Sequence, residues 1–201
     1  MTAVHVDPYY ILSGGAEGAV RVWARTSRKM LIQFMDQKKD ITGLFPDAAQ
    51  PNVIHSCSLD RTISTYDLKQ EKKLKSQQVP NGTLHGMSQR RINSNELVTC
   101  GQGVPILFWD PLKNGEPLNQ IQYPYKVLTI QVSPTGQYVA FGTETNEVIV
   151  FKLLEAGQPP QFMAKGVGHS GPVTCLKWTP DAKQIISVSA DASISVWNFY
   201  G

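Results

Sequence analysis

The chain has 201 residues, of which 41% are hydrophobic and 17% charged, a balance typical of a folded globular protein and not of a disordered one. Its net charge of +3 is too small to predict nucleic-acid binding, and its three cysteines argue against a disulfide framework. No apolar run approaches the roughly 20 residues of a membrane span, and the N-terminus lacks signal-peptide features. We therefore expect a soluble, intracellular protein.

Five similar stretches follow one another along the chain, and each closes on an aromatic residue. In each stretch two alternating runs flank a short polar turn, and this pattern is typical of β-hairpins. The closing runs are AVRVW, TISTY, PILFW, EVIVF and SISVW, which end at Trp23, Tyr66, Trp109, Phe151 and Trp197. The intervals between these aromatic residues are 43, 43, 42 and 46 residues.

Each hairpin has a further run before it, and each of the first four hairpins has a more polar run after it. Four strands repeated about every 42 residues are typical of β-propeller blades. The predicted fold is therefore all-β, and the last unit should lack its outer strand. The five units cover approximately residues 1–36, 37–80, 81–124, 125–168 and 169–201.

Short motifs in these units resemble those of the WD-repeat family. Gly168–His169 matches the opening pair of a WD repeat, and Tyr66–Asp67 and Trp109–Asp110 match its closing pair. The resemblance implies a WD40-type propeller, which typically has seven blades. Five units would then form an incomplete ring, which either missing sequence of the same protein or a further chain completes.

The same resemblance implies a role for the polar residues of the last unit. In the WD-repeat pattern they form a structural hydrogen-bond chain within one blade, here His169, Ser187, Ser189, Asp191 and Trp197. These residue types also suggest a catalytic triad, but their recurrence with the repeat favours the structural interpretation. Units in which the motif is degraded are expected to hold their hairpins by packing alone.

No other motif predicts chemistry. Cys57 and Cys100 occupy one repeated strand position and are interpreted as packing thiols, and no paired cysteines predict zinc. We expect no metal, no cofactor and no enzymatic activity.

Four lysines, Lys69, Lys72, Lys73 and Lys75, either protect an exposed strand edge or form a docking surface for an acidic partner.

The last repeat, with VGHSG and ISVSAD, is similar to that of WD-repeat proteins of cilia and flagella that line doublet microtubules. That resemblance implies a structural protein of the axoneme, a microtubule inner protein bound to tubulin and to neighbouring lumenal proteins. The alternative is a generic WD-repeat scaffold or adaptor in the cytosol or nucleus. Neither hypothesis includes nucleic-acid or membrane binding.

Overall fold

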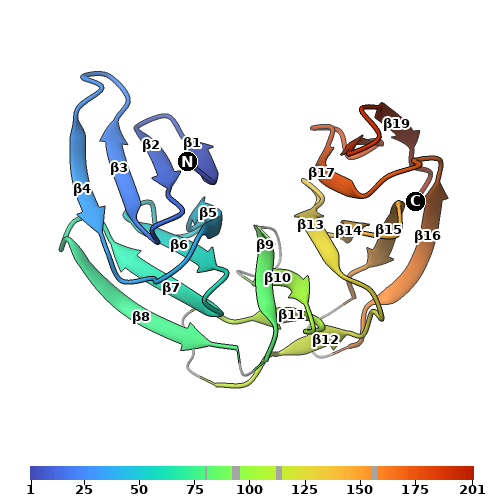
Figure 1. The fold of residues 1–201 in the computed structure, drawn as a ribbon, viewed down its shortest axis with the longest axis horizontal. Coiled ribbons are helices and arrows are strands. Elements are labelled where there is room, and N and C mark those ends of the chain that lie inside the picture. The colour runs from blue at the N-terminus through green and yellow to red at the C-terminus, as the bar shows by residue number, and fades with distance from the viewer. Residues whose placement is uncertain (80, 92–95, 112–114, 155–157) are drawn as a thin grey trace. The chain divides into compact units, whose positions relative to one another are not determined.

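The computed structural model describes residues 1–79, 81–91, 96–111, 115–154 and 158–201 (Figure 1). Within these ranges 19 strands form five antiparallel sheets, four of them four-stranded and the last three-stranded. The all-β prediction, with sheets like the blades of a WD40 propeller, is confirmed. None of the described segments is a helix long and apolar enough to cross a membrane.

The chain divides into two compact units, of which Met1–His85 is the first. It contains two sheets whose strands follow in chain order. The strands of the first sheet are β1 (Ala3–Val6), β2 (Tyr10–Gly14), β3 (Val20–Ala24) and β4 (Met30–Phe34). Those of the second are β5 (Ile41–Pro46), β6 (Val53–Ser58), β7 (Thr62–Asp67) and β8 (Lys72–Gln78).

The second unit, Gly86–Gly201, contains the remaining sheets, although β9 begins just before the boundary. The third sheet consists of β9 (Thr83–Gln89), β10 (Leu97–Gln102), β11 (Ile106–Trp109) and β12 (Asn119–Ile121). The fourth consists of β13 (Val127–Val132), β14 (Tyr138–Thr143), β15 (Glu147–Lys152) and β16 (Gln161–Val167). The fifth consists of β17 (Val173–Trp178), β18 (Gln184–Ser189) and β19 (Ile194–Asn198).

All five sheets share one hairpin register. The closing aromatic residue lies on the third strand of its sheet and pairs with the residue twelve positions earlier on the second strand. Five residues before the aromatic, the turn has a left-handed backbone in four sheets, at Gly18, Arg61, Asn146 and Ala192. A constant turn gives a constant register, because a one-residue slip would turn every buried side chain outward.

Apolar side chains join neighbouring sheets within each unit. In the first unit, Leu12, Val20 and Val22 pack in one cluster with Ile41 and Ile54 of the second sheet. In the second unit, one cluster joins the third and fourth sheets and another joins the fourth and fifth. Each fully buried side chain of this size contributes about 1.5–3 kcal/mol. The repeated contacts between sheets therefore supply most of the stability.

The fifth sheet ends at β19, as the sequence predicted, without an outer strand among the described residues. Ile194 and Val196 on β19 are 71% and 57% exposed. No described strand pairs with the open edge of β19, so no strand exchange closes a ring there.

The hairpin turn of the first sheet offers a test of the packing between sheets. At Gly18, where φ is +82°, an added Cβ would lie 2.1 Å from the backbone oxygen of Gln37. We expect Gly18→Ala to lower the free energy of unfolding by about 1–3 kcal/mol, because backbone atoms must move apart. A side chain at φ +82° is itself strained, although Ala192 occupies the equivalent turn position with φ +64°, so both the contact and the turn contribute to this cost. Equal urea midpoints for wild type and variant would contradict this.

Candidate functional site

The polar residues of the fifth sheet converge on the buried ring of His169, in the loop between β16 and β17. His169 Nε2 lies 2.6 Å from Ser187 Oγ, and Trp197 Nε1 donates to the same oxygen at 2.8 Å. His169 Nδ1 lies 2.9 Å from Ser193 Oγ and 3.3 Å from Asp191 Oδ2. The network thus connects the entry loop, β18, the hairpin turn and β19.

Asp191 anchors this network at the turn. The Ser193 hydroxyl donates to Asp191 Oδ1 at 2.5 Å, and the backbone N–H groups of Ser170 and Ser193 donate at 2.7 Å and 2.8 Å. These hydrogen bonds, that of the Ser193 side chain foremost, hold the pKa of Asp191 well below its usual range despite an opposing effect of burial. The carboxylate is therefore charged at neutral pH.

Ser189 joins this network through Asp191, and Ser193 joins it through both Asp191 and His169. Ser189 does not touch His169 in the described contacts; its hydroxyl donates to Gly171 O at 2.8 Å and accepts from Asp191 N at 3.2 Å. Ser193, which the sequence analysis did not select, takes the place beside the imidazole. The signal that could have identified it is a hydroxyl residue two positions after the turn aspartate.

The second sheet contains the same network with a glutamine in place of the histidine. Ser56 Oγ donates to Gln37 Oε1 at 2.5 Å, and Gln37 Nε2 donates to Thr62 Oγ1 at 2.8 Å. Thr62 Oγ1 in turn donates to Asp60 Oδ1 at 2.5 Å, and Lys38 N donates to Asp60 Oδ2 at 2.6 Å. The sequence analysis did not predict this network, because the unit lacks the opening Gly-His pair.

The Gln37 amide indicates which ring nitrogen of His169 carries the donated proton. The hydrogen bonds of the two networks correspond at a sequence offset of 131 or 132 positions, with Ser56 matching Ser187 and Thr62 matching Ser193. An amide oxygen only accepts and an amide nitrogen only donates. By equivalence, His169 accepts from Ser187 at Nε2 and donates from Nδ1 towards Ser193 and Asp191.

The fourth sheet replaces the network with aromatic rings. Tyr123 stands 28 residues before Phe151, as His169 stands before Trp197, and its ring meets Phe141 edge-on at 5.2 Å. Phe141 stacks on Phe151 at 5.9 Å. The Tyr123 hydroxyl donates to Glu147 at 2.7 Å, and burial followed by the Glu147 carboxylate raises the Tyr123 pKa to about 12. Packing alone was expected in this degraded unit, and that expectation is wrong, because the Tyr123–Glu147 hydrogen bond joins the ring contacts.

In the first and third sheets the tryptophan end of the network is present among the described residues. Trp23 Nε1 donates to Ser13 Oγ at 2.8 Å, and Trp109 Nε1 donates to Thr99 Oγ1 at 2.9 Å. The acceptor stands ten residues before the tryptophan in both sheets, as Ser187 does before Trp197. Trp23 and Trp109 therefore form these hydrogen bonds within their own hairpins.

These arrangements hold strands together and offer no reaction site. Ser187 has no exposed surface, so its hydroxyl cannot reach a substrate. Burial raises the pKa of Cys57 to about 12, which keeps that thiol protonated, and Cys100 is buried as well. Among the described residues, no group of three or more His, Cys, Asp or Glu could hold a metal ion.

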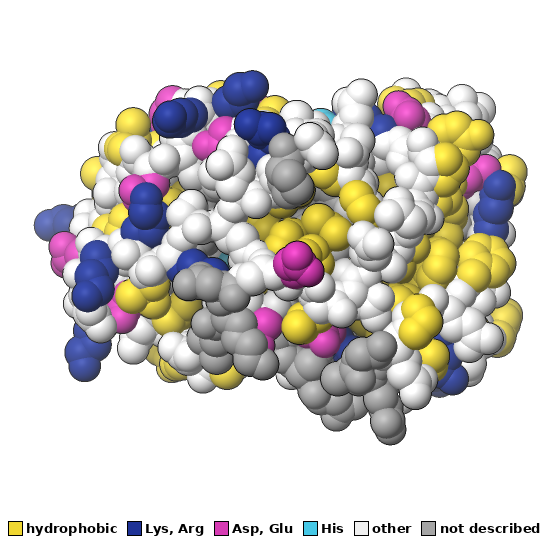
Figure 2. Space-filling model, turned by 90° about the horizontal axis from the view of Figure 1, so that it is seen from below, with side chains coloured by type: hydrophobic (Ala, Val, Ile, Leu, Met, Phe, Trp, Pro, Cys, Tyr) yellow, Lys and Arg dark blue, Asp and Glu magenta, His cyan; other side chains and the backbone are white. Residues whose placement is uncertain are grey.

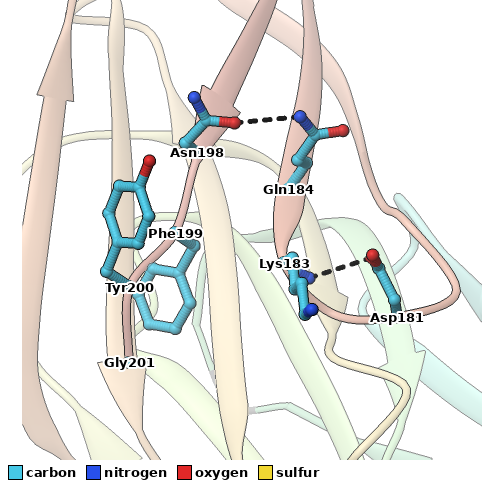
Figure 3. Close-up of a pocket in the computed structure, with 7 residues that line it drawn as sticks. All are labelled: Asp181, Lys183, Gln184, Asn198, Phe199, Tyr200 and Gly201. Atoms are coloured by element: carbon cyan, nitrogen blue, oxygen red, sulfur yellow. Dashed lines mark hydrogen bonds between the residues drawn. The ribbon is translucent and has the colours of Figure 1, made fainter.

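One open pocket of about 730 Å³ lies at the end of β18 and β19 (Figure 3). Gln184 Nε2 donates to Asn198 Oδ1 across it at 2.9 Å, and Lys183 N donates to Asp181 at 3.1 Å. The residues that line it are Asp181, Lys183, Gln184, Asn198, Phe199, Tyr200 and Gly201. This mixture of amides, charges and aromatic rings beside an open strand edge suits contact with another chain better than catalysis.

The four lysines selected from the sequence lie on β8 and in the turn before it. Lys73 Nζ is 2.5 Å from Asp36 Oδ1, so its charge is paired within the first unit. Lys69 and Lys72 are exposed. This pairing supports the interpretation as a solvated, protected edge, and a docking role for these lysines stays a prediction.

Comparison with known proteins supports the WD-repeat assignment. Residues 161–198, which span β16 to β19, match the family "WD domain, G-beta repeat". Human cilia- and flagella-associated protein 52 is 25% identical over 191 residues, covering 94% of this chain and 30% of that protein. The resemblance to the WD-repeat family is thereby confirmed.

Other relatives have different names. The Drosophila melanogaster protein groucho is 25% identical over 199 residues, covering 95% of this chain and 25% of that protein. Mouse echinoderm microtubule-associated protein-like 3 is 31% identical over 72 residues, covering 36% of this chain and 8% of that protein. The chain spans about 30% of the length of the cilia- and flagella-associated relatives it matches.

The fifth-sheet network makes a prediction about pH. Because the folded pKa of Asp191 is lowered, its contribution is complete above the unfolded value near 3.9 and is lost as pH falls through the folded value. We expect the amide protection factors of Ser170 and Ser193 to decline below about pH 4, while those of β14 persist. Asp191→Asn should abolish this decline. Constant protection of both amides down to strong acid would contradict the role of Asp191.

Proposed function

We propose that the protein is a structural component of cilia or flagella, a microtubule inner protein that binds tubulin and neighbouring lumenal proteins. The observation that carries this proposal is similarity along 94% of the chain to cilia- and flagella-associated protein 52. The buried networks support a scaffold, because they stiffen the sheets and leave loops and strand edges for contact. A generic cytosolic or nuclear scaffold is the second candidate, because a relative whose name does not mention cilia also matches 95% of the chain at 25% identity.

Axoneme extraction separates the two candidates. The full-length protein would be tagged in ciliated cells, and cilia would be treated with detergent and then with high salt. A lumenal structural protein should stay with the axoneme through both steps, as a tubulin control does. Release by detergent alone, or a signal confined to the cytosol or nucleus, would favour the generic scaffold.

The open edge of β19 also has a proposed partner. Exposed ladder groups with apolar neighbours, here Ile194 and Val196, favour pairing with another strand. We expect a strand of the full-length protein or of a partner chain to pair there. Hydrogen exchange at β19 should then be slow in the full-length protein and fast in the 201-residue chain. Equally slow exchange in both would show that no added strand is required.

A further inference from the structure

A basic and apolar surface lies at the outer edge of the first sheet, apart from the lysines of β8. This β4 surface consists of Arg25, Arg28 and Lys29 in the turn before β4, followed by Met30 and Leu31 on the strand. The three cations are exposed, and Met30 and Leu31 are 48% and 51% exposed. It combines positive charge, apolar side chains and an unpaired strand edge.

The charge on this surface is not balanced by neighbouring acids. The sequence contains no Asp or Glu from residue 18 to residue 35. Within the described part of the chain, Arg28 and Lys29 form no ion pair, and Arg25 Nη1 donates only to the backbone oxygen of Asp7, at 3.4 Å. Asp7 Oδ1 accepts from the N–H groups of Tyr9 and Tyr10, and no ion pair joins Asp7 to these cations in the described part of the chain. Three cations are therefore available to an anion.

The excess charge of the whole chain lies in the same unit. Residues 1–85 contain 11 Lys and Arg against 8 Asp and Glu, and residues 86–201 contain 8 of each. Figure 2 shows Lys and Arg side chains gathered on part of one face of the molecule. An acidic partner would accordingly be attracted to this unit.

The edge of β4 lacks the protection found on other long outer strands. β8 carries three lysines, one of them paired with Asp36, and β16 carries Lys165, which pairs with Glu147. β4 (MLIQF) carries no charged residue over its five positions. Its outer backbone groups have no partner strand among the described residues. An edge of this kind takes up an extended peptide as an additional strand.

We propose that the β4 surface binds an extended acidic segment of a partner protein, which pairs with the free edge of β4. Its carboxylates would face Arg25, Arg28 and Lys29, and its apolar side chains would cover Met30 and Leu31. The apolar half of the surface favours a peptide over a polyanion without side chains. The proposal rests on the scaffold function but not on its location in the cilium.

The test uses the 201-residue chain and a short synthetic peptide that alternates Glu and Val, with fluorescence anisotropy as the readout. We expect Arg28→Glu/Lys29→Glu to weaken peptide binding about tenfold, and high salt to weaken binding to the wild type. The matched control Lys69→Glu/Lys72→Glu makes the same change in charge beside β8 and should leave the affinity unchanged. Thermal unfolding of both variants establishes that each is folded.

Two further probes test the mode of binding. The same peptide N-methylated at alternate residues cannot pair as a strand, and it should bind far more weakly. Inorganic polyphosphate should compete poorly. Equal losses in the two charge variants, undiminished binding of the N-methylated peptide, or polyphosphate binding as tight as that of the peptide would each overturn the proposal. None of these outcomes depends on whether the protein is retained in axonemes, so the two proposals fail independently.

Discussion

Replacing Arg90 with alanine should lower the free energy of unfolding of the second unit by about 3–5 kcal/mol, because it leaves a buried carboxylate without its partner. The Arg90 side chain is 9% exposed and pairs with Glu96, itself 12% exposed, at 3.3 Å. Arg90 Nε also donates to Gly136 O at 2.8 Å, and Nη2 donates to Leu154 O at 3.3 Å. One side chain thus connects the end of β9 to the turns of the fourth sheet.

Urea unfolding of three variants would measure this effect. Arg28→Ala, at an exposed arginine without an ion pair among the described residues, should change stability by less than about 0.5 kcal/mol. Adding Glu96→Gln to Arg90→Ala should recover part of the loss, since it removes the uncompensated charge. A loss below about 1 kcal/mol for Arg90→Ala would contradict the assigned role.

Substitutions at His169 and Gln37, the central residues of the two polar networks, should show whether stability depends on their hydrogen bonds or on the type of residue. His169→Ala and Gln37→Ala should each cost about 1–3 kcal/mol, because each leaves a buried serine hydroxyl and its neighbours short of a partner. His169→Gln should cost clearly less than His169→Ala. The reason is that the amide supplies one acceptor for Ser187 and one donor for Ser193, as Gln37 does for Ser56 and Thr62.

The repeat structure lets these losses be assigned to single sheets. Hydrogen exchange should rise in β18 and β19 for the His169 variants, and in β6 and β7 for Gln37→Ala, since repeats contact mainly their neighbours. Nitrogen chemical shifts of His169 should show that Nδ1 carries the donated proton and that Nε2 accepts. Equal costs for His169→Gln and His169→Ala, or a proton on Nε2, would show that the two networks are not equivalent.

The sheets were predictable from the sequence because they depend on pattern. Period-two alternation, polar turns and an aromatic residue about every 42 positions indicate four-stranded units without reference to any single contact. The open outer edge of the last sheet followed from the same pattern, since the chain after Trp197 is too short for another strand. Register and turn geometry depend on residues that lie close together in the sequence, so a sequence pattern can predict them.

The hydrogen-bond networks were only partly predictable because they depend on geometry. Gln37 replaces a histidine in a unit without the opening Gly-His pair, so a search for that pair misses it. In the fourth sheet Tyr123 occupies the position of His169 and packs its ring against Phe141. Ser193 rather than Ser189 meets the imidazole, which only the fold of the turn decides. At these equivalent positions the type of residue changes, but each residue still forms hydrogen bonds or packs within its sheet.

Location inside the doublet microtubule is the central proposal, and protection of a tag would test it most directly. The full-length protein would carry a tag, and isolated doublets would be labelled with antibody before and after they are mechanically opened. We predict no labelling of intact doublets and strong labelling once their lumen is exposed. Labelling of intact doublets along their outer surface, or no labelling in either state when the tag is present in cytosolic fractions, would contradict a lumenal scaffold.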